Sequence, residues 1–182
     1  MALTQIQQDG LSSNAYVGIS ANVLYSVSAG RANIIASTTI GVGGATPASS
    51  GAGITFPGTQ SASSDGNTLD DYEEGTWTPS NSSSTALSIN NTATYIKIGK
   101  LVFINADINQ LNQDSVYGLP FTSASTGYPG VVSVGYSGYQ SQTLTGEFNG
   151  GTTNLTLRYN GSTQITPSNN RFIIAGCYVA SA

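Results

Sequence analysis

Five carboxylates gather in one short stretch of the chain, where they could bind a metal ion. They are five of the nine acidic residues: Asp65, Asp70, Asp71, Glu73 and Glu74. Calcium prefers several carboxylate oxygens, and Asp65-Gly66-Asn67 imitates the start of a calcium-binding loop. The last position of such a loop, however, holds Thr76 where a bidentate glutamate is needed. We therefore predict no metal and no cofactor, and interpret the stretch as an acidic turn that Trp77 and Tyr72 anchor by packing.

Catalytic chemistry has little support in the residue types. The chain has no histidine to activate a serine, and its single cysteine, Cys177, lies in an apolar run. A carboxylate pair for glycan cleavage would come from Asp107, Asp114 or Glu147, and no spacing singles these out. The glycine-rich stretches 41–44 and 51–53 lack the lysine and the following helix of a phosphate-binding loop. The sequence predicts no enzymatic activity and no catalytic residue.

Four tyrosines are the better candidates for binding. Tyr117, Tyr128, Tyr136 and Tyr139 stand among Gly, Ser and Gln, between expected strands. Exposed Tyr beside small polar residues makes a rigid hydrogen-bonding surface that suits a glycan or another epitope. The alternative is that half of them pack at an interface between subunits. Both interpretations stay open.

The composition narrows the fold class and the partners. Charged residues are only 8% of the 182 residues, with too few Lys and Glu for a helical protein, and ten Tyr favour strands. A net charge of −4 with five bases cannot neutralise a run of phosphates, so no nucleic-acid partner is expected. No apolar stretch approaches the roughly 20 residues that span a bilayer, so no membrane partner is expected. The first residues lack the basic and apolar regions of a secretion signal.

Short strands separated by turns are expected from residue 67 to residue 182. In the run 100–108, Val102, Ile104, Ala106 and Ile108 line one face and Leu101, Phe103, Asn105 and Asp107 the other. Asn149-Gly150-Gly151 predicts a hairpin turn because it tolerates positive φ. The run 172–180 is apolar on both faces, which predicts a buried central strand or a subunit contact. We predict an all-β fold whose C-terminal part is an antiparallel, jelly-roll-like β-sandwich knob.

Two further segments precede this knob. Residues 31–66 are rich in Gly, Ser and Thr and bury too little apolar surface to fold alone, so they predict an extended shaft or connector. Three copies wound together could bury one shared apolar line, which predicts a homotrimer. Residues 1–30 carry many apolar side chains and one charge, Asp9, and are expected to attach to a partner protein. The candidates for the shared line are Ile34, Ile40, Val42, Ile54 and Phe56.

The segment 53–79 resembles a "GITFP…NTLDDYEEGTWTP" stretch found before a C-terminal β domain in many bacteriophage tail-fibre and appendage proteins. Later landmarks at 95–102 and 119–121 are similar as well, so the resemblance covers roughly residues 50 to 125. It implies a non-enzymatic virion protein, a homotrimer with its N-terminus on the particle and its knob outward. Ile54, Phe56, Tyr72 and Trp77 fall in this segment and are assigned to the trimer contact or the junction of shaft and knob.

Two roles follow from this resemblance as expectations. The first is a short fibre or spike on the virion surface whose knob takes part in host attachment, with a host-surface glycan as its partner. The second is an architectural role on the capsid, as a head fibre, decoration or cement protein. A shaft of residues 31–66 spans at most about 120 Å at about 3.3 Å per residue, which favours a short appendage over a long tail fibre.

Overall fold

The computed structural model describes residues 39–59, 63–125, 129–137, 144–159, 163–164 and 170–181. The chain divides into two compact units, Met1–Ser37 and Thr38–Ala182, and all described residues belong to the second. The predicted attachment segment 1–30 and Ile34 of the predicted connector lie outside the described residues.

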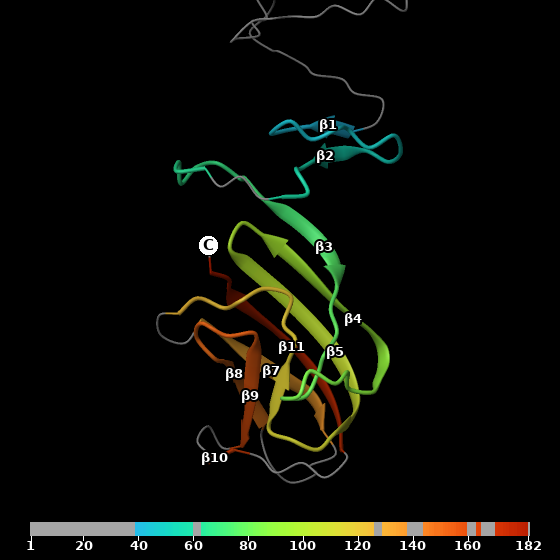
Figure 1. Cartoon of the computed structure of the whole chain (residues 1–182), viewed down its shortest axis with the longest axis vertical. Helices are drawn as coiled ribbons and strands as arrows, with labels where there is room; N and C mark the ends of the chain where they lie inside the picture. The colour runs from blue at the N-terminus through green and yellow to red at the C-terminus, as the bar shows by residue number, and fades with distance from the viewer. Residues whose placement is uncertain are drawn as a thin grey trace, which may run out of the picture. The chain divides into compact units, whose positions relative to one another are not determined.

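The described residues form strands, turns and loops with no helix among them, which confirms the predicted all-β fold (Figure 1). The strands are β1 (Thr39–Gly41), β2 (Gly53–Thr55), β3 (Tyr72–Thr76), β4 (Ile89–Ile98), β5 (Leu101–Leu111), β6 (Ser115–Tyr117), β7 (Gly130–Ser137), β8 (Leu144–Phe148), β9 (Asn154–Tyr159), β10 (Thr163–Gln164) and β11 (Asn170–Val179).

Strands β1 and β2 form a small parallel pair in the predicted connector. Ile40 lies opposite Ile54, and the Thr55 hydroxyl donates to the Thr39 Oγ1 at 2.8 Å. Parallel neighbours cannot be joined by a tight hairpin, so the chain from 42 to 52 crosses back to start β2 beside β1. This pairing makes the described part of the connector more compact than a fully extended chain.

The other nine strands pair in one curled antiparallel sheet, in the order β10-β9-β8-β7-β11-β5-β4-β3, with β6 beside β9 (Figure 1). The chain just after β3 returns to β6: Ser80 N–H donates to the Tyr117 carbonyl at 2.9 Å, and Tyr117 N–H donates back at 3.0 Å. These bonds link the β3 end of the sheet to the β6–β9 pair, which supports the curl. The strands expected in a sandwich are therefore paired in a single sheet that encloses one core.

The two faces of β5 separate as the sequence predicts except at Asp107, which was expected on the face of Leu101 and Phe103 but is only 8% exposed because Arg171 and Asn90 cover it. Val102, Ile104 and Ile108 are at most 4% exposed, whereas Leu101 and Phe103 are 38% and 43% exposed. Successive side chains of a strand point to opposite faces, so the first set lines the core. The core contains Trp77, Ala93, Val102, Ile104, Ala106, Ile108, Leu111, Val116, Leu119, Val132, Leu144, Phe148, Leu155, Leu157, Phe172, Ile174, Tyr178 and Ala180.

Strand β11 is central, between β5 and β7, which confirms one of the two interpretations of its apolar sequence. Phe172, Ile174 and Tyr178 are buried in the core, and the Tyr178 ring lies 4.6 Å from the Phe148 ring, measured between centroids. Its other face is less covered, since Val179 is 41% exposed. The predicted turn at 149–151 joins the antiparallel strands β8 and β9, and Gly151 adopts a φ of 71° there.

Candidate functional site

The acidic stretch is divided between a loop and the edge strand β3. In the loop, Asp65 Oδ1 accepts from the Asn67 N–H at 2.9 Å, and Asp70 Oδ2 accepts from the Ser63 N–H at 2.6 Å. Among the residues that the structure describes, no group of three or more His, Cys, Asp or Glu is arranged to hold a metal ion. Each of the five acids instead has its own partner within the chain.

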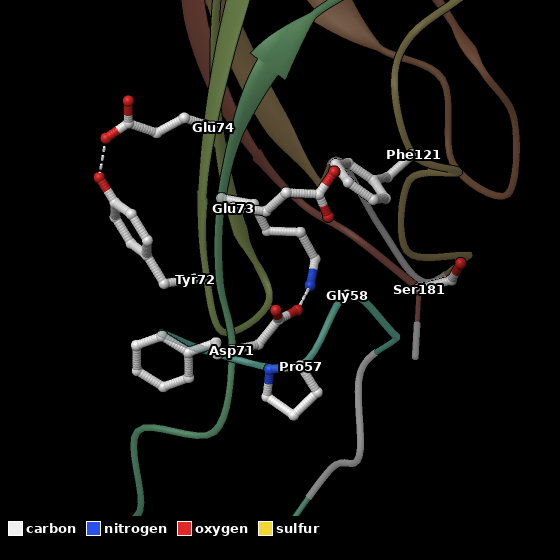
Figure 2. A pocket seen from close by; sticks show the side chains of 10 residues that line it. Pro57, Gly58, Asp71, Tyr72, Glu73, Glu74, Phe121 and Ser181 are labelled. Carbon is white, nitrogen blue, oxygen red and sulfur yellow. Dashed lines mark hydrogen bonds and ion pairs between the residues drawn. The ribbon is translucent and has the colours of Figure 1, made fainter. Parts of the chain in front are cut away.

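Strand β3 sends its acids to opposite sides (Figure 2). Tyr72 and Glu74 lie on one side, where the Tyr72 hydroxyl donates to the Glu74 carboxylate. Glu73 lies on the other side near Phe121, opposite Lys97 of β4 in the strand register. The alternation of a strand therefore distributes the predicted acidic cluster over two surfaces.

Lys97 and Asp71 form a buried ion pair, the most unusual polar feature of this region. Their side chains are 6% and 7% exposed, and the Lys97 ammonium lies 5.2 Å from the centre of the Phe121 ring. Desolvation lowers the pKa of Lys97, against the opposing charge of Asp70. A pair removed from water in this way holds two segments in one arrangement, because separating it leaves a buried charge.

Tyr95 connects the same region to the sheet. Its hydroxyl donates to Glu73, and its ring meets Phe121 edge-on at 5.4 Å between centroids. Burial, followed by the bond to Glu73, raises the pKa of Tyr95 to about 12. A Cβ on Gly75 would lie 2.7 Å from the Tyr95 ring, so the glycine of the Glu-Glu-Gly-Thr-Trp run permits this close approach.

These residues border a cavity of about 540 Å³, which we call the junction pocket. Phe56, Pro57 and Gly58, from the chain after β2, line one part of it. The rest is lined by Asp71, the first residues of β3, Lys97, Phe121 and Ser181. Figure 2 shows Pro57 and Gly58 on the segment that lies across from β3. The Phe56 and Tyr72 ring centres are 6.4 Å apart. Phe56 and Tyr72, which the sequence assigned to the junction, are thus brought together.

The other two residues assigned to the junction lie elsewhere. Trp77 is buried in the core at 6% exposure, as predicted, and its Nε1–H donates to the Asn105 carbonyl at 3.1 Å. Ile54 is 57% exposed on β2. The resemblance covers the whole segment 53–79 and does not distinguish its residues. Only the strand register shows which of them line the junction pocket and which lie in the core.

The tyrosines expected to form a binding surface do not line a single described feature. Tyr117 lies in β6 beside a shallow hollow with Thr152 and Asn154, whereas Tyr136 is 46% exposed in β7. Tyr128 and Tyr139 lie outside the described residues. The Arg171 guanidinium lies 5.3 Å from the centre of the Tyr136 ring.

A polar cluster beside Tyr136 could not be found from the sequence. Arg171 binds Asp107 through two hydrogen bonds of 2.8 and 2.7 Å, and Asn90 donates to the same carboxylate at 2.9 Å. The bonds from Arg171 first, and then from Asn90, lower the pKa of Asp107 to about 2. Asp107 and Arg171 are 64 positions apart, and only the pairing of β5 with β11 brings them together.

The three carboxylates considered for glycan cleavage have separate partners. Asp107 is held by Arg171, Asp114 accepts from the Ser115 hydroxyl at 2.9 Å, and Glu147 accepts from Arg158 Nε at 2.8 Å. In the described part of the chain, every buried side-chain nitrogen or oxygen has a hydrogen-bond partner. The polar groups of the junction pocket and of the Asp107 cluster therefore satisfy one another, which suits structural or binding surfaces.

No family model, no curated protein and no solved structure matches the chain. Among the described residues there is no helix long and apolar enough to cross a membrane.

Proposed function

We propose that the chain is a non-enzymatic structural protein of a bacteriophage virion, displayed on the virion surface as a short trimeric fibre or spike. The segment 53–79 is the observation that carries this proposal, because it resembles the segment before the C-terminal β domain of phage appendage proteins. Its residues end the connector, form β3 and supply Trp77 to the core. A segment of this kind suits an appendage in which a shaft must be joined firmly to a folded knob.

The junction pocket supports the same function. Its buried Lys97–Asp71 pair and the Phe56–Tyr72 contact tie the chain after β2 to the sheet. In an appendage, such a joint keeps the knob aligned with its shaft. The described part of the proposed knob is one curled antiparallel sheet around a single core, which is compatible with the jelly-roll-like knob that the sequence predicts.

Trimerisation is the second element of the proposal. The parallel β1–β2 pair exposes Ile40 at 36%, Val42 at 36% and Ile54 at 57%. An isolated chain would leave these side chains in water, whereas three copies can bury them along a common axis. The segment 1–30 then binds another virion protein through apolar contacts.

Host attachment is the role proposed for the knob. The exposed Tyr136 ring, with Arg171 over it and Asn90 and Asn91 nearby on Asp107, presents an aromatic surface beside hydrogen-bonding groups. Glycans are bound by such combinations of flat ring and polar side chains. A host-surface glycan is therefore the proposed partner.

A purely architectural role on the capsid, as a head fibre, decoration or cement protein, is the second candidate. The parallel pair of β1 and β2 favours it, because this pairing shortens a connector that could span only about 120 Å when fully extended.

Electron microscopy of the phage particle separates the two roles. Antibodies raised against the recombinant full chain are bound to purified particles of the phage that encodes it, and detected with gold. Label at the tail supports the attachment fibre, and label over the capsid supports the architectural role. Particles without label would contradict both. A chain lacking residues 1–30 should be missing from particles, and its normal incorporation would contradict the proposed anchor.

A further inference from the structure

The outer face of the sheet carries a continuous apolar surface that the core does not use. Two rows of side chains cross the strands at one end of the sheet. One row is Tyr72, Ile98, Leu101 and Val179, and the next is Ile96, Phe103, Cys177 and Val131; we call these eight residues the outer apolar patch. Each neighbour in a row is a direct partner on the adjacent strand.

The patch is exposed, although it lies over the central strands. Apart from the half-buried Cys177, its members are 38% to 68% exposed. Together they present roughly 500 Å² of apolar surface, as large as the largest patch on a typical monomer. The next row along the sheet, with Thr94, Asn105 and Ser133, is polar. The patch therefore has a boundary, as a contact surface does.

We infer that this patch is the contact surface between copies of this chain in the trimer proposed above. None of its eight side chains is charged, so its partner must also be apolar where the two meet. Charges flank the row at both ends: Glu74 lies next to Ile96, and Glu147, held by Arg158, lies next to Val131. An apolar centre with a polar rim is the usual anatomy of a protein interface.

A second copy fits the area that is available. In a three-fold arrangement each patch of roughly 500 Å² meets parts of two neighbouring patches, so three copies bury about 1,500 Å² in total. A trimer gives each copy two neighbours, so the patch is covered from both sides. A second copy carries the same uncharged apolar patch. A different protein would need an uncharged apolar surface of similar size of its own.

The shape of the patch indicates how neighbouring copies meet. Tyr72 lies on the edge strand β3 at one end and is 40% exposed, with its ring beside Phe56 and its hydroxyl on Glu74. At the other end, a hollow of about 680 Å³ lies on β7 and β8, lined by Val131, Ser133 and Thr145 and by the ion pair of Glu147 with Arg158. A contact between these two different ends would be head to tail, and such contacts form a ring when the rotation between copies closes.

The test compares two substitutions on one face of one strand. Phe103 and Asn105 both point outward from β5, Phe103 within the patch and Asn105 in the polar row. The full chain, Phe103→Glu, Val131→Glu and the control Asn105→Glu are weighed by native mass spectrometry and sedimentation. We expect three times 18.6 kDa for the wild type and for Asn105→Glu. Phe103→Glu and Val131→Glu should weaken association by about 30-fold or more, with unchanged far-ultraviolet circular dichroism.

Each other outcome overturns the inference in a recognisable way. A trimer that Phe103→Glu and Val131→Glu leave intact shows that other residues, such as Ile40 and Ile54, make the contact. A monomeric wild type shows that no second copy covers the patch, and it also removes the trimer from the proposed function. The inference rests on the proposed trimer. Antibody labelling of phage particles tests the virion role without reference to the trimer. The virion role and this contact surface can therefore be contradicted independently of each other.

Discussion

The two faces of the curled sheet are both apolar, but they differ in how they are covered. On the inner face, Val102, Phe172 and Ile174 are fully buried by the rest of the same chain. On the outer face, the neighbouring Phe103 and Val179 on the same two strands keep about two-fifths of their surface exposed. Alternation within a strand tells which residues share a face, but it does not tell what covers that face.

The polar groups show the same contrast. Lys97 and Asp71 pair out of water at the junction pocket, whereas Arg171 pairs with Asp107 on the outer face with its own side chain 43% exposed. A buried pair resists separation because each charge would remain desolvated, whereas the second pair is buried only at Asp107, whose side chain is 9% exposed, and its Arg171 side is screened by water and salt. The junction pair is therefore expected to resist separation more strongly than the pair on the outer face.

Removal of Trp77 should have the largest effect. Trp77→Ala empties a buried site of the inner face and leaves the Asn105 carbonyl without the indole donor, so we expect unfolding free energy to fall by about 3–5 kcal/mol. Chemical denaturation followed by circular dichroism measures this loss. The control is Tyr136→Ala on the outer face, where the loss should be about 1 kcal/mol or less. Equal stability of Trp77→Ala and the wild type would show that the acidic segment is only a surface loop.

Breaking the ion pair of the junction should have the next largest effect. Lys97→Met leaves the Asp71 carboxylate buried without its cation, and we expect a loss of about 2–4 kcal/mol. The double variant Lys97→Met/Asp71→Leu removes both charges and should recover most of that loss in denaturant unfolding. A double variant no more stable than Lys97→Met would mean that the pair is not what stabilises the joint.

Tyr178 should make the inner face sensitive to alkali. Burial raises the pKa of Tyr178 to about 12 from its ordinary value of 10.0. The unfolded chain therefore loses this proton at lower pH than the fold, so stability is full below pH 10 and declines as the pH rises toward 12, by about 2 kcal/mol. Melting temperatures of wild type and Tyr178→Phe across this range measure the effect. The variant should show the smaller decline, after allowance for its lost bonds to Phe121.

Asp107 should give the smallest effect, at the acid end. Its pKa is lowered from 3.8 to about 2, so the unfolded chain takes up the proton first as the pH falls. The stabilisation that Asp107 contributes is therefore present above pH 4 and is lost as the pH falls through 2. Thermal melts of wild type and Asp107→Asn between pH 5 and pH 2 should converge as the pH falls. If the melting temperatures of the two proteins instead differed by the same amount at every pH, the ionised form of Asp107 would not be the source of this stabilisation.

The sequence alone determined the features that depend on neighbours along the chain. The alternation in residues 101–108 predicts which side chains of β5 enter the core, and the Asn-Gly-Gly turn predicts the β8–β9 hairpin, because both depend on local backbone geometry. The apolar pattern of 172–180 predicts either a central strand or a subunit contact, and the structure places β11 centrally, between β5 and β7.

Only the tertiary structure decided which distant residues meet. Asp71 and Lys97 are 26 positions apart, and Asp107 and Arg171 are 64 apart, so their pairing follows from strand register and from no local pattern. The same holds for the parallel pairing of β1 with β2 and for the union of nine strands in one curled sheet. Register also aligns Ile96, Phe103, Cys177 and Val131 across four strands. A strand's own residues set its two faces, but the order and offset of strands depend on the free energy of the whole sheet, which no single segment contains.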